Sequence, residues 1–244
     1  MPTPPELDNL VVVLVRTRNP LNVGAAARAM SNFGAHRLRL VNPYSVAFRE
    51  ARSAVGASDV LLRAEEYKTL TEAVADCTLV VGTTAGRNRT LSLALRRLDA
   101  ATTELRQHLK TGLVALLFGS EKIGLTNDDF SHCHWLLTIP TEKAHISMNL
   151  GQAVAVCLYE LARGDKSHPT APGLEKAASG LNEQISQALL EALAKSGYVK
   201  PNSESACENK VRRMVLRFGL DPEDAKVLLG MVRQIVWRLR QGKS

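Results

Sequence analysis

The sequence predicts an α/β fold, with a mostly parallel sheet that has helices on both faces and a small all-helical domain after it. Two continuous apolar runs, residues 10–15 and 113–118, have the composition of strands buried on both faces of a sheet. Segments with helical periodicity alternate with the strand-like runs, which is typical of a parallel sheet. After Gly164 the remaining periodic segments are all helical.

The first 163 residues divide into strands and helices in a regular order. Strands are expected over residues 10–15, 37–41, 78–82, 113–118 and 135–139. Helices are expected over residues 22–32, 50–55, 69–76, 100–110 and 149–163. Asn22 is expected to cap the first helix and Gly34 to end it, with Val23, Ala27 and Met30 facing inward.

The rest of the chain is predicted to form a linker and three helices. Residues 165–180 contain two prolines and two glycines and show little periodicity. Helices follow over residues 181–195, 205–218 and 222–241; a capping box from Ser205 to Glu208 opens the second, and Asp221-Pro222 opens the third. We therefore expect an α/β domain over residues 1–164, a linker over residues 165–180 and a basic helical domain over residues 181–244.

Composition restricts the class of protein. The 244 residues are 45% hydrophobic and 23% charged, which is typical of a globular chain. No run of 18 apolar residues predicts a membrane span, and the first residues lack the pattern of a signal peptide. The four cysteines lie far apart without a CxxC pair. We expect a cytoplasmic protein with no membrane anchor and no disulfide framework.

The net charge of +7 is concentrated near the C-terminus, where residues 200–244 account for +5. Two rows of cations follow the helical repeat there: Lys210, Arg213 and Arg217, and then Lys226, Arg233 and Arg240. Apolar residues on another side of the last helix are expected to pack: Leu228, Met231, Ile235 and Leu239. Such rows favour a phosphate backbone as partner, although ordinary solvated helix faces show the same pattern.

Three polar segments follow predicted strands and are more unusual than folding requires. The first, from Arg16 to Arg28, leads from a strand into a helix N-terminus, where ligands of open α/β sheets bind and anions are attracted. Arg28 lies about 140° around the helix from Val23, off the apolar stripe, so it is either functional or a solvated surface residue. The third segment, residues 139–153, leads into the strong helix, which Ser147 or Asn149 could cap.

The second segment, residues 118–125, has Gly119 and Gly124 at the spacing of a phosphate-binding loop. Leu125 stands where that loop requires lysine, which argues against an ATPase, and the lack of a G-x-G argues against a dinucleotide fingerprint. The run from His132 to His134 could suggest a metal, but adjacent ligands rarely complete a tetrahedral site. We expect neither a metal nor a cysteine nucleophile.

In their order and spacing, the three segments resemble the signature motifs of the SpoU (TrmH) class of SPOUT RNA 2′-O-ribose methyltransferases. The N-P-x-N-V-G-A-x-x-R motif matches residues 19–28, F-G-x-E-x-x-G-L matches residues 118–125, and S-[LM]-N-L-x-x-A matches residues 147–153. Ser120 departs from the class, whose members commonly carry Arg or Asn there. The tail, with Gly197-Tyr198 and Lys210-Val-Arg212-Arg213, further resembles the TrmJ branch, which modifies tRNA.

The resemblance implies a C-terminal trefoil knot, a homodimer, and S-adenosylmethionine as cofactor. By match to the class, the residues that bind the cofactor are Thr83, Thr84, Ala85, Phe118, Gly119, Glu121, Ile139, Ile146, Ser147 and Met148. The implied catalytic residues are Arg28, Asn22, Glu121, Ser147 and Asn149. A guanidinium is effectively always protonated, so Arg28 would clamp the target phosphate and orient the hydroxyl rather than accept its proton.

The TrmJ resemblance implies methylation of the ribose of cytidine or uridine 32 in the tRNA anticodon loop. Arg16 and Arg18, with the six tail cations, would contact the RNA. One alternative is a SpoU-type enzyme for another tRNA position or for rRNA. A non-catalytic RNA-binding module and a nucleotide enzyme that does not act on RNA are others; the intact motifs argue against the former and the basic tail against the latter.

Overall fold

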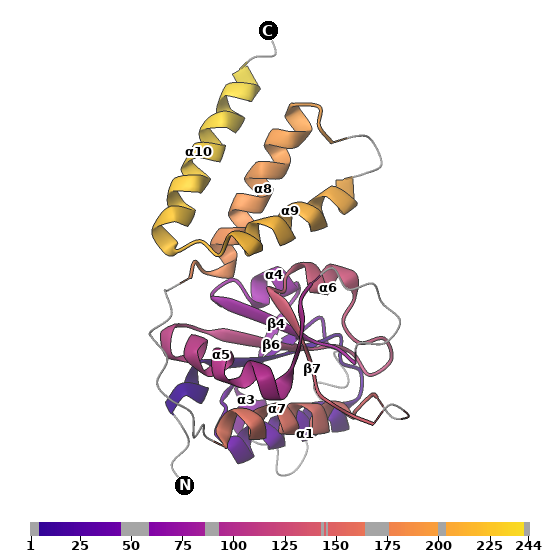
Figure 1. The fold of residues 1–244 in the computed structure, drawn as a ribbon. Coiled ribbons are helices and arrows are strands. Elements are labelled where there is room, and N and C mark those ends of the chain that lie inside the picture. The colour runs from indigo at the N-terminus through magenta and orange to yellow at the C-terminus, as the bar shows by residue number, and fades with distance from the viewer. Residues whose placement is uncertain are drawn as a thin grey trace.

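The computed structural model describes residues 5–44, 59–85, 93–142, 144, 146–163, 176–199 and 204–241. Within these ranges a seven-stranded sheet lies between two layers of helices, and three more helices extend from one side (Figure 1). Every strand pairing in the sheet is parallel, and the strand order is β3-β2-β1-β6-β4-β7-β5. The predicted α/β class and mostly parallel sheet are confirmed.

The central strands are buried and the edge strands are not. The strands are β1 (Leu10–Val15), β2 (Arg37–Val41), β3 (Glu65–Tyr67), β4 (Leu79–Thr83), β5 (Leu95–Arg97), β6 (Val114–Phe118) and β7 (Trp135–Thr138). Every residue of β1 and β6 is buried, as expected for apolar strands covered on both faces. Sequence analysis missed β3 and β5, which are short, lie at the two edges and carry charged side chains.

Two layers of helices cover the sheet. On one face lie α1 (Pro20–Phe33), α3 (Asp59–Leu62), α5 (Leu98–Thr111) and α7 (Leu150–Ala162), and on the other α4 (Leu70–Ala73) and α6 (Asn127–Ser131) (Figure 1). A short 3-10 helix, η1 (Pro5–Asn9), precedes β1. Successive side chains of β1 point to opposite faces of the sheet. Val12 and Leu14 pack against the first layer of helices, and Val11 and Val13 pack against the second. The helix expected over residues 50–55 lies outside the described residues.

Helix α1 begins two residues before the predicted cap. Asn19 is the capping residue: its Oδ1 accepts a hydrogen bond from the backbone N–H of Leu21 (2.9 Å), and Pro20 is the first helical residue. The expectation that Asn22 caps the helix was therefore wrong, since the motif contains two asparagines and only the first precedes the proline. Gly34 ends the helix at φ +73°, as predicted.

Three helices follow the sheet and share a core of their own. They are α8 (Ser179–Lys195), α9 (Glu204–Phe218) and α10 (Pro222–Gln241). The shared core includes Ile185 from α8, Val215 from α9 and Leu229 from α10. Glu204 is already helical, so Ser205 lies inside α9 and the predicted capping box at this residue was wrong. Most of the expected linker lies outside the described residues.

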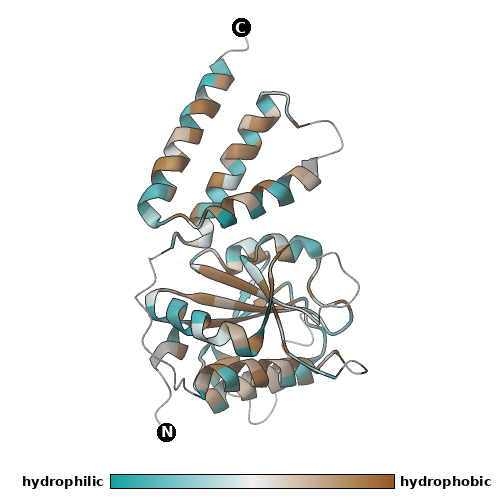
Figure 2. Ribbon diagram, in the orientation of Figure 1, coloured by the Kyte–Doolittle hydropathy of each residue, from teal (hydrophilic) through white to brown (hydrophobic). Residues whose placement is uncertain are grey.

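The packing face of α10 differs in part from the predicted one, although Leu228 packs against the shared core as expected. The buried residues are Ala225, Leu229, Val232 and Val236. Met231 and Ile235, which we expected to pack, are 60% and 54% exposed. Apolar residues occur on several sides of this helix, as the mixed colours of α10 in Figure 2 show, so periodicity alone did not identify the buried side.

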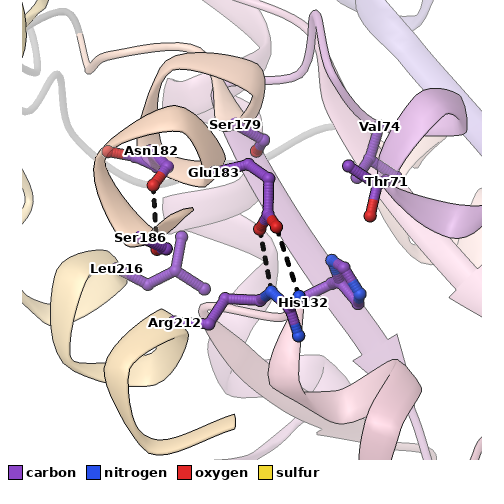
Figure 3. Close-up of a pocket in the computed structure, with 9 residues that line it drawn as sticks. All are labelled: Thr71, Val74, His132, Ser179, Asn182, Glu183, Ser186, Arg212 and Leu216. Atoms are coloured by element: carbon purple, nitrogen blue, oxygen red, sulfur yellow. Dashed lines mark hydrogen bonds and ion pairs between the residues drawn. The ribbon is translucent and has the colours of Figure 1, made fainter. Parts of the chain in front are cut away.

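Buried polar contacts attach the tail helices to the layer formed by α4 and α6. The hydroxyl and the backbone N–H of Ser179 each donate to the carbonyl of Cys77 (2.7 Å). Arg212 of α9 is 7% exposed and donates to Glu183 of α8 (2.8 and 3.2 Å) and to the hydroxyl of Ser131 in α6 (2.9 Å). Figure 3 shows the paired Arg212 and Glu183 beside His132, where α6 meets the tail helices.

The structure gives His134 a structural role. Its Nδ1 accepts a hydrogen bond from the backbone N–H of Val80 (3.0 Å), and its own backbone N–H donates to the Val80 carbonyl (2.8 Å). Desolvation of the ring lowers the pKa of His134 to about 4. The imidazole is therefore neutral at physiological pH, and its hydrogen bond with Val80 links the start of β7 to β4.

We expect the free energy of unfolding to decrease as the pH falls from about 6.5 towards 4, because the unfolded chain binds a proton at His134 that the folded chain excludes. Urea unfolding at a series of pH values measures this slope. His134→Asn, which keeps an acceptor for Val80 but no titrating ring, should flatten the slope, and the exposed His36→Gln should not. Equal slopes for wild type and His134→Asn would contradict the assignment.

Candidate active site

The loops after three neighbouring strands enclose a cavity at the carboxyl edge of the sheet. These strands are β6, β4 and β7, which are adjacent in the sheet order. The cavity has a volume of about 520 Å³, a size typical of cofactor sites. Every residue expected to bind the cofactor lines it: Thr83, Thr84, Ala85, Phe118, Gly119, Glu121, Ile139, Ile146, Ser147 and Met148.

A chain of hydrogen bonds joins the three motif segments beside the cavity. Asn22 Nδ2 donates to Glu121 Oε1 (2.9 Å), and Asn149 Nδ2 donates to Asn22 Oδ1 (2.8 Å). The other oxygen of Glu121 accepts from the backbone N–H of Arg18 (3.4 Å). Asn149 also caps α7, because its Oδ1 accepts from the backbone N–H of Gly151 (2.9 Å). Three of the expected catalytic residues therefore lie together.

Small residues make this meeting possible. A Cβ on Gly151 would lie 2.6 Å from the Cβ of Ala25, so the missing side chain lets α7 approach α1 and brings Asn149 to Asn22. In the second segment a Cβ on Gly119 would lie 2.1 Å from the carbonyl carbon of Gly124. The missing side chain of Gly119 therefore allows the tight turn that closes on Gly124, and both glycines line the cavity.

The arginines of the first segment have different surroundings. Arg28 is exposed on α1 and does not line the cavity, unlike Asn22 of the same helix. Arg16 pairs with the buried carboxylate of Asp129, with 3.0 Å between Nη1 and Oδ1. Arg18 is exposed at the loop. The structure thus brings together four of the five expected catalytic residues, with Ser147 on the cavity wall, and leaves Arg28 outside.

The tail cations also differ in their contacts. Arg233 donates to Gln184 (3.1 Å), and Arg240 donates to Glu191 (2.8 and 2.9 Å), so these two side chains of α10 turn towards α8. Arg213 donates to the backbone carbonyl of Asn209 (3.0 Å). The remaining expected RNA-binding residues of the tail are exposed: Lys210, Arg217 and Lys226.

Other chemistries find little support in the described part of the chain. It contains no group of three His, Cys, Asp or Glu side chains able to hold a metal ion. Burial raises the pKa of the Cys77 and Cys157 thiols to about 12, so neither is a thiolate at neutral pH. Among the helices of these ranges, none is both long and apolar enough to cross a membrane.

Sequence analysis missed two residues that organise the surroundings of the site. Asp129 accepts hydrogen bonds from Arg16, and Arg212 links α9 to α6 through its hydrogen bond to Ser131. Asp129 had a detectable signal, because Thr126 and Asp129 form a capping box, a spacing visible in the sequence. Arg212 had none beyond its place in the tail motif, since periodicity does not distinguish a buried arginine from its exposed neighbours.

Comparison with known proteins identifies the family. Residues 9–159 match the model of the SpoU rRNA Methylase family. The chain belongs to this family of RNA methyltransferases, whose methyl donor is S-adenosylmethionine.

Several proteins similar to this chain over most of its length are named TrmJ. The chain is 37% identical over 240 residues to the tRNA (cytidine/uridine-2′-O-)-methyltransferase TrmJ of Cronobacter sakazakii, covering 94% of this chain and 96% of that protein. It is 34% identical over 235 residues to TrmJ of Pectobacterium atrosepticum, covering 94% and 97%. The crystal structure of TrmJ from Z. mobilis ZM4 superposes with a TM-score of 0.80 at 31% identity, covering 92% of this chain and 98% of that one.

The cavity residues suit S-adenosylmethionine, which combines an aromatic base with hydroxyl, carboxylate and sulfonium groups. Leu137, Ile139 and Ile146 line the cavity with apolar surface, which an aromatic base requires. The threonines and the segment around Gly119 line the same cavity and carry groups able to hydrogen-bond. The residues present therefore fit the cofactor.

We expect Glu121→Ala to lower the rate of methyl transfer by roughly 10–100-fold, because the loop before α1 loses the carboxylate that holds Arg18 and Asn22. A radiolabelled methyl-transfer assay with saturating cofactor measures the rate. Glu66→Ala removes an exposed carboxylate at the far edge of the sheet and should leave it unchanged. A rate for Glu121→Ala within twofold of wild type would contradict this role.

Proposed function

We propose that the protein is an S-adenosylmethionine-dependent tRNA (cytidine/uridine-2′-O-)-methyltransferase that modifies nucleotide 32 of the anticodon loop. The observation that carries the proposal is the hydrogen-bonded meeting of three motif segments at a cofactor-sized cavity. Proteins named TrmJ match 94% of the chain, and they support tRNA as the substrate. Position 32 rests on the resemblance to the TrmJ branch.

The reaction requires positioning more than acid–base chemistry. When bound, S-adenosylmethionine supplies an activated methyl group. Asn22, Glu121 and Asn149 fix the segments around the cavity. Ser147, which lines the cavity, would orient the third segment. Arg28 would clamp the target phosphate and steer the 2′-hydroxyl, because its guanidinium stays protonated. A phosphate oxygen or water would then accept the hydroxyl proton.

We further propose a homodimer whose site is completed across the interface. Arg28 lies outside the cavity of its own chain, which supports a contribution from a second copy. Leu21 on α1 and Tyr159 on α7 are 78% and 56% exposed and offer apolar surface near this helix pair. The family also implies a trefoil knot in the C-terminal part of the sheet, formed within a domain over residues 1–164.

The tail over residues 181–244, after the linker over 165–180, is proposed to be a helical domain that grips tRNA. Its exposed cations Lys210, Arg217 and Lys226 support this role, and Arg18 lies at the active-site loop. Arg213, Arg233 and Arg240 would have to exchange their present partners for phosphate. We place this activity in the cytoplasm with its tRNA substrate.

The full-length protein, labelled cofactor and bulk tRNA test the function. We expect label in 2′-O-methylcytidine and 2′-O-methyluridine, and mapping by mass spectrometry should place it at position 32. Label on a base would contradict the reaction. The family description favours rRNA as a second candidate, and methylation of ribosomal RNA without tRNA would support that alternative.

We expect Arg28→Ala to lower the rate of methyl transfer by roughly 100-fold or more while the affinity for S-adenosylmethionine stays nearly unchanged, because Arg28 does not line the cavity. Rates of transfer and calorimetric titration with the cofactor check both parts. Arg28→Lys should restore only part of the rate, since an ammonium lacks the planar fork. Near-normal turnover of Arg28→Ala would refute the assignment.

We expect the double variant Arg217→Gln/Lys226→Gln to bind tRNA with a weaker salt dependence. If both cations contact phosphates, the slope of log affinity against log salt falls by about 1.4–1.8. The matched variant Arg63→Gln/Lys68→Gln removes two exposed cations from the α/β part and should keep the wild-type slope. Equal slopes for the two variants would mean that the tail does not grip RNA through these residues.

A further inference from the structure

The loop that leads from β1 into the active site is held at its first residue. Arg16 adopts φ +53°, a left-handed conformation that is uncommon for a residue with a side chain. Its backbone N–H donates to the carbonyl of Val41 (2.9 Å). Its guanidinium pairs with both carboxylate oxygens of Asp129. Main chain and side chain together hold the chain in this sharp turn.

The partner carboxylate is buried and fully engaged. Asp129 is 3% exposed, and its Oδ2 also accepts from the backbone N–H and the hydroxyl of Thr126 (2.6 and 2.8 Å). Burial opposes its ionisation, but the hydrogen bonds from Arg16 and Thr126 outweigh burial, and the pKa of Asp129 lies below its ordinary value. The carboxylate is therefore charged at neutral pH, and without Arg16 it would be a poorly compensated buried charge.

This ion pair lies outside the cavity and ties the first motif segment to the helix that follows the second. Asp129 is on α6, which begins just after the second segment, and Arg16 begins the first. Two and six residues after Arg16, Arg18 and Asn22 donate to Glu121 of the second segment. The loop is thus tied to the same stretch of chain at both of its ends.

We propose that Asp129 is a positioning residue for methyl transfer and that it acts through Arg16. The pair holds the loop so that Asn22 reaches Glu121 and Asn149. The guanidinium of Arg16 accordingly pairs with Asp129 and does not contact an RNA phosphate. Helix α6 is itself held from its other side, because Arg212 of the tail donates to Ser131. The proposal rests on the methyltransferase function proposed above.

The test compares Asp129→Asn and Arg16→Lys, which weaken the pair, with Asp128→Asn, which removes the exposed neighbouring carboxylate on α6. We expect single-turnover methyl transfer to slow by about 10–100-fold in the first two and to stay normal in the control. Affinities for the cofactor and for tRNA should stay within about threefold of wild type, since neither residue lines the cavity. Combining both changes should add little to the larger single effect, because they remove one interaction.

Amide hydrogen exchange gives a readout that does not depend on activity. The backbone amides of residues 17–19, 21 and 22 should exchange faster in Asp129→Asn and Arg16→Lys than in wild type, with no change in Asp128→Asn. If wild type transfers no methyl group to RNA but this exchange pattern appears, the proposed function fails while the positioning contact stands.

Two results would overturn the proposal. One is wild-type exchange and a normal rate in folded Asp129→Asn; if that variant does not fold, the same result in Arg16→Lys decides. The other is that Arg16→Gln behaves as a variant that has lost one phosphate contact. Its turnover at saturating tRNA would then equal that of wild type, and its slope of log tRNA affinity against log salt would be lower by about 0.7–0.9. That result would assign Arg16 to the RNA.

Discussion

The carboxylate of Glu121 is the contact on which the rest of the site depends. It accepts hydrogen bonds from the backbone of Arg18 and from the side chain of Asn22, and Asn22 in turn accepts from Asn149. These bonds join Asn22 to Glu121, 99 residues further along the chain, and to Asn149, 127 residues further along. Contacts of this kind hold the surroundings of the cavity in one arrangement.

The parallel sheet makes this meeting possible. The strands β1, β6, β4 and β7 are consecutive in the sheet, so all four of their carboxyl ends lie at one edge. Close packing of α1 against α7 at Gly151 then brings the start of both helices to that edge. A ribose hydroxyl is a weak nucleophile, and its methylation gains most from accurate placement of the two reactants. A rigid edge with hydrogen-bonded loops is suited to this task.

The buried part of the fold was the most predictable. The bounds of β1 and β2 were predicted correctly, because apolar or alternating runs bounded by polar loops leave little choice. The edge strands β3 and β5 escaped detection, since each has only three residues and two of these are charged, which gives no strand signal. In α10, apolar side chains on several faces hid the buried one, which only the position of α8 determines. The expected cofactor residues did meet at one cavity, and the position of Arg28 off the apolar stripe agrees with its exposure. The pairing of Arg16 with Asp129 depends on tertiary placement and is not visible in the periodicity.

A crystal structure of the full-length protein with S-adenosylmethionine tests the central claim most directly. The account predicts that the cofactor occupies the cavity between the loops that follow β4, β6 and β7, and that the bonds from Asn22 to Glu121 and from Asn149 to Asn22 are retained beside it. Cofactor bound elsewhere on the chain, or bound in this cavity with those two bonds broken, would contradict it.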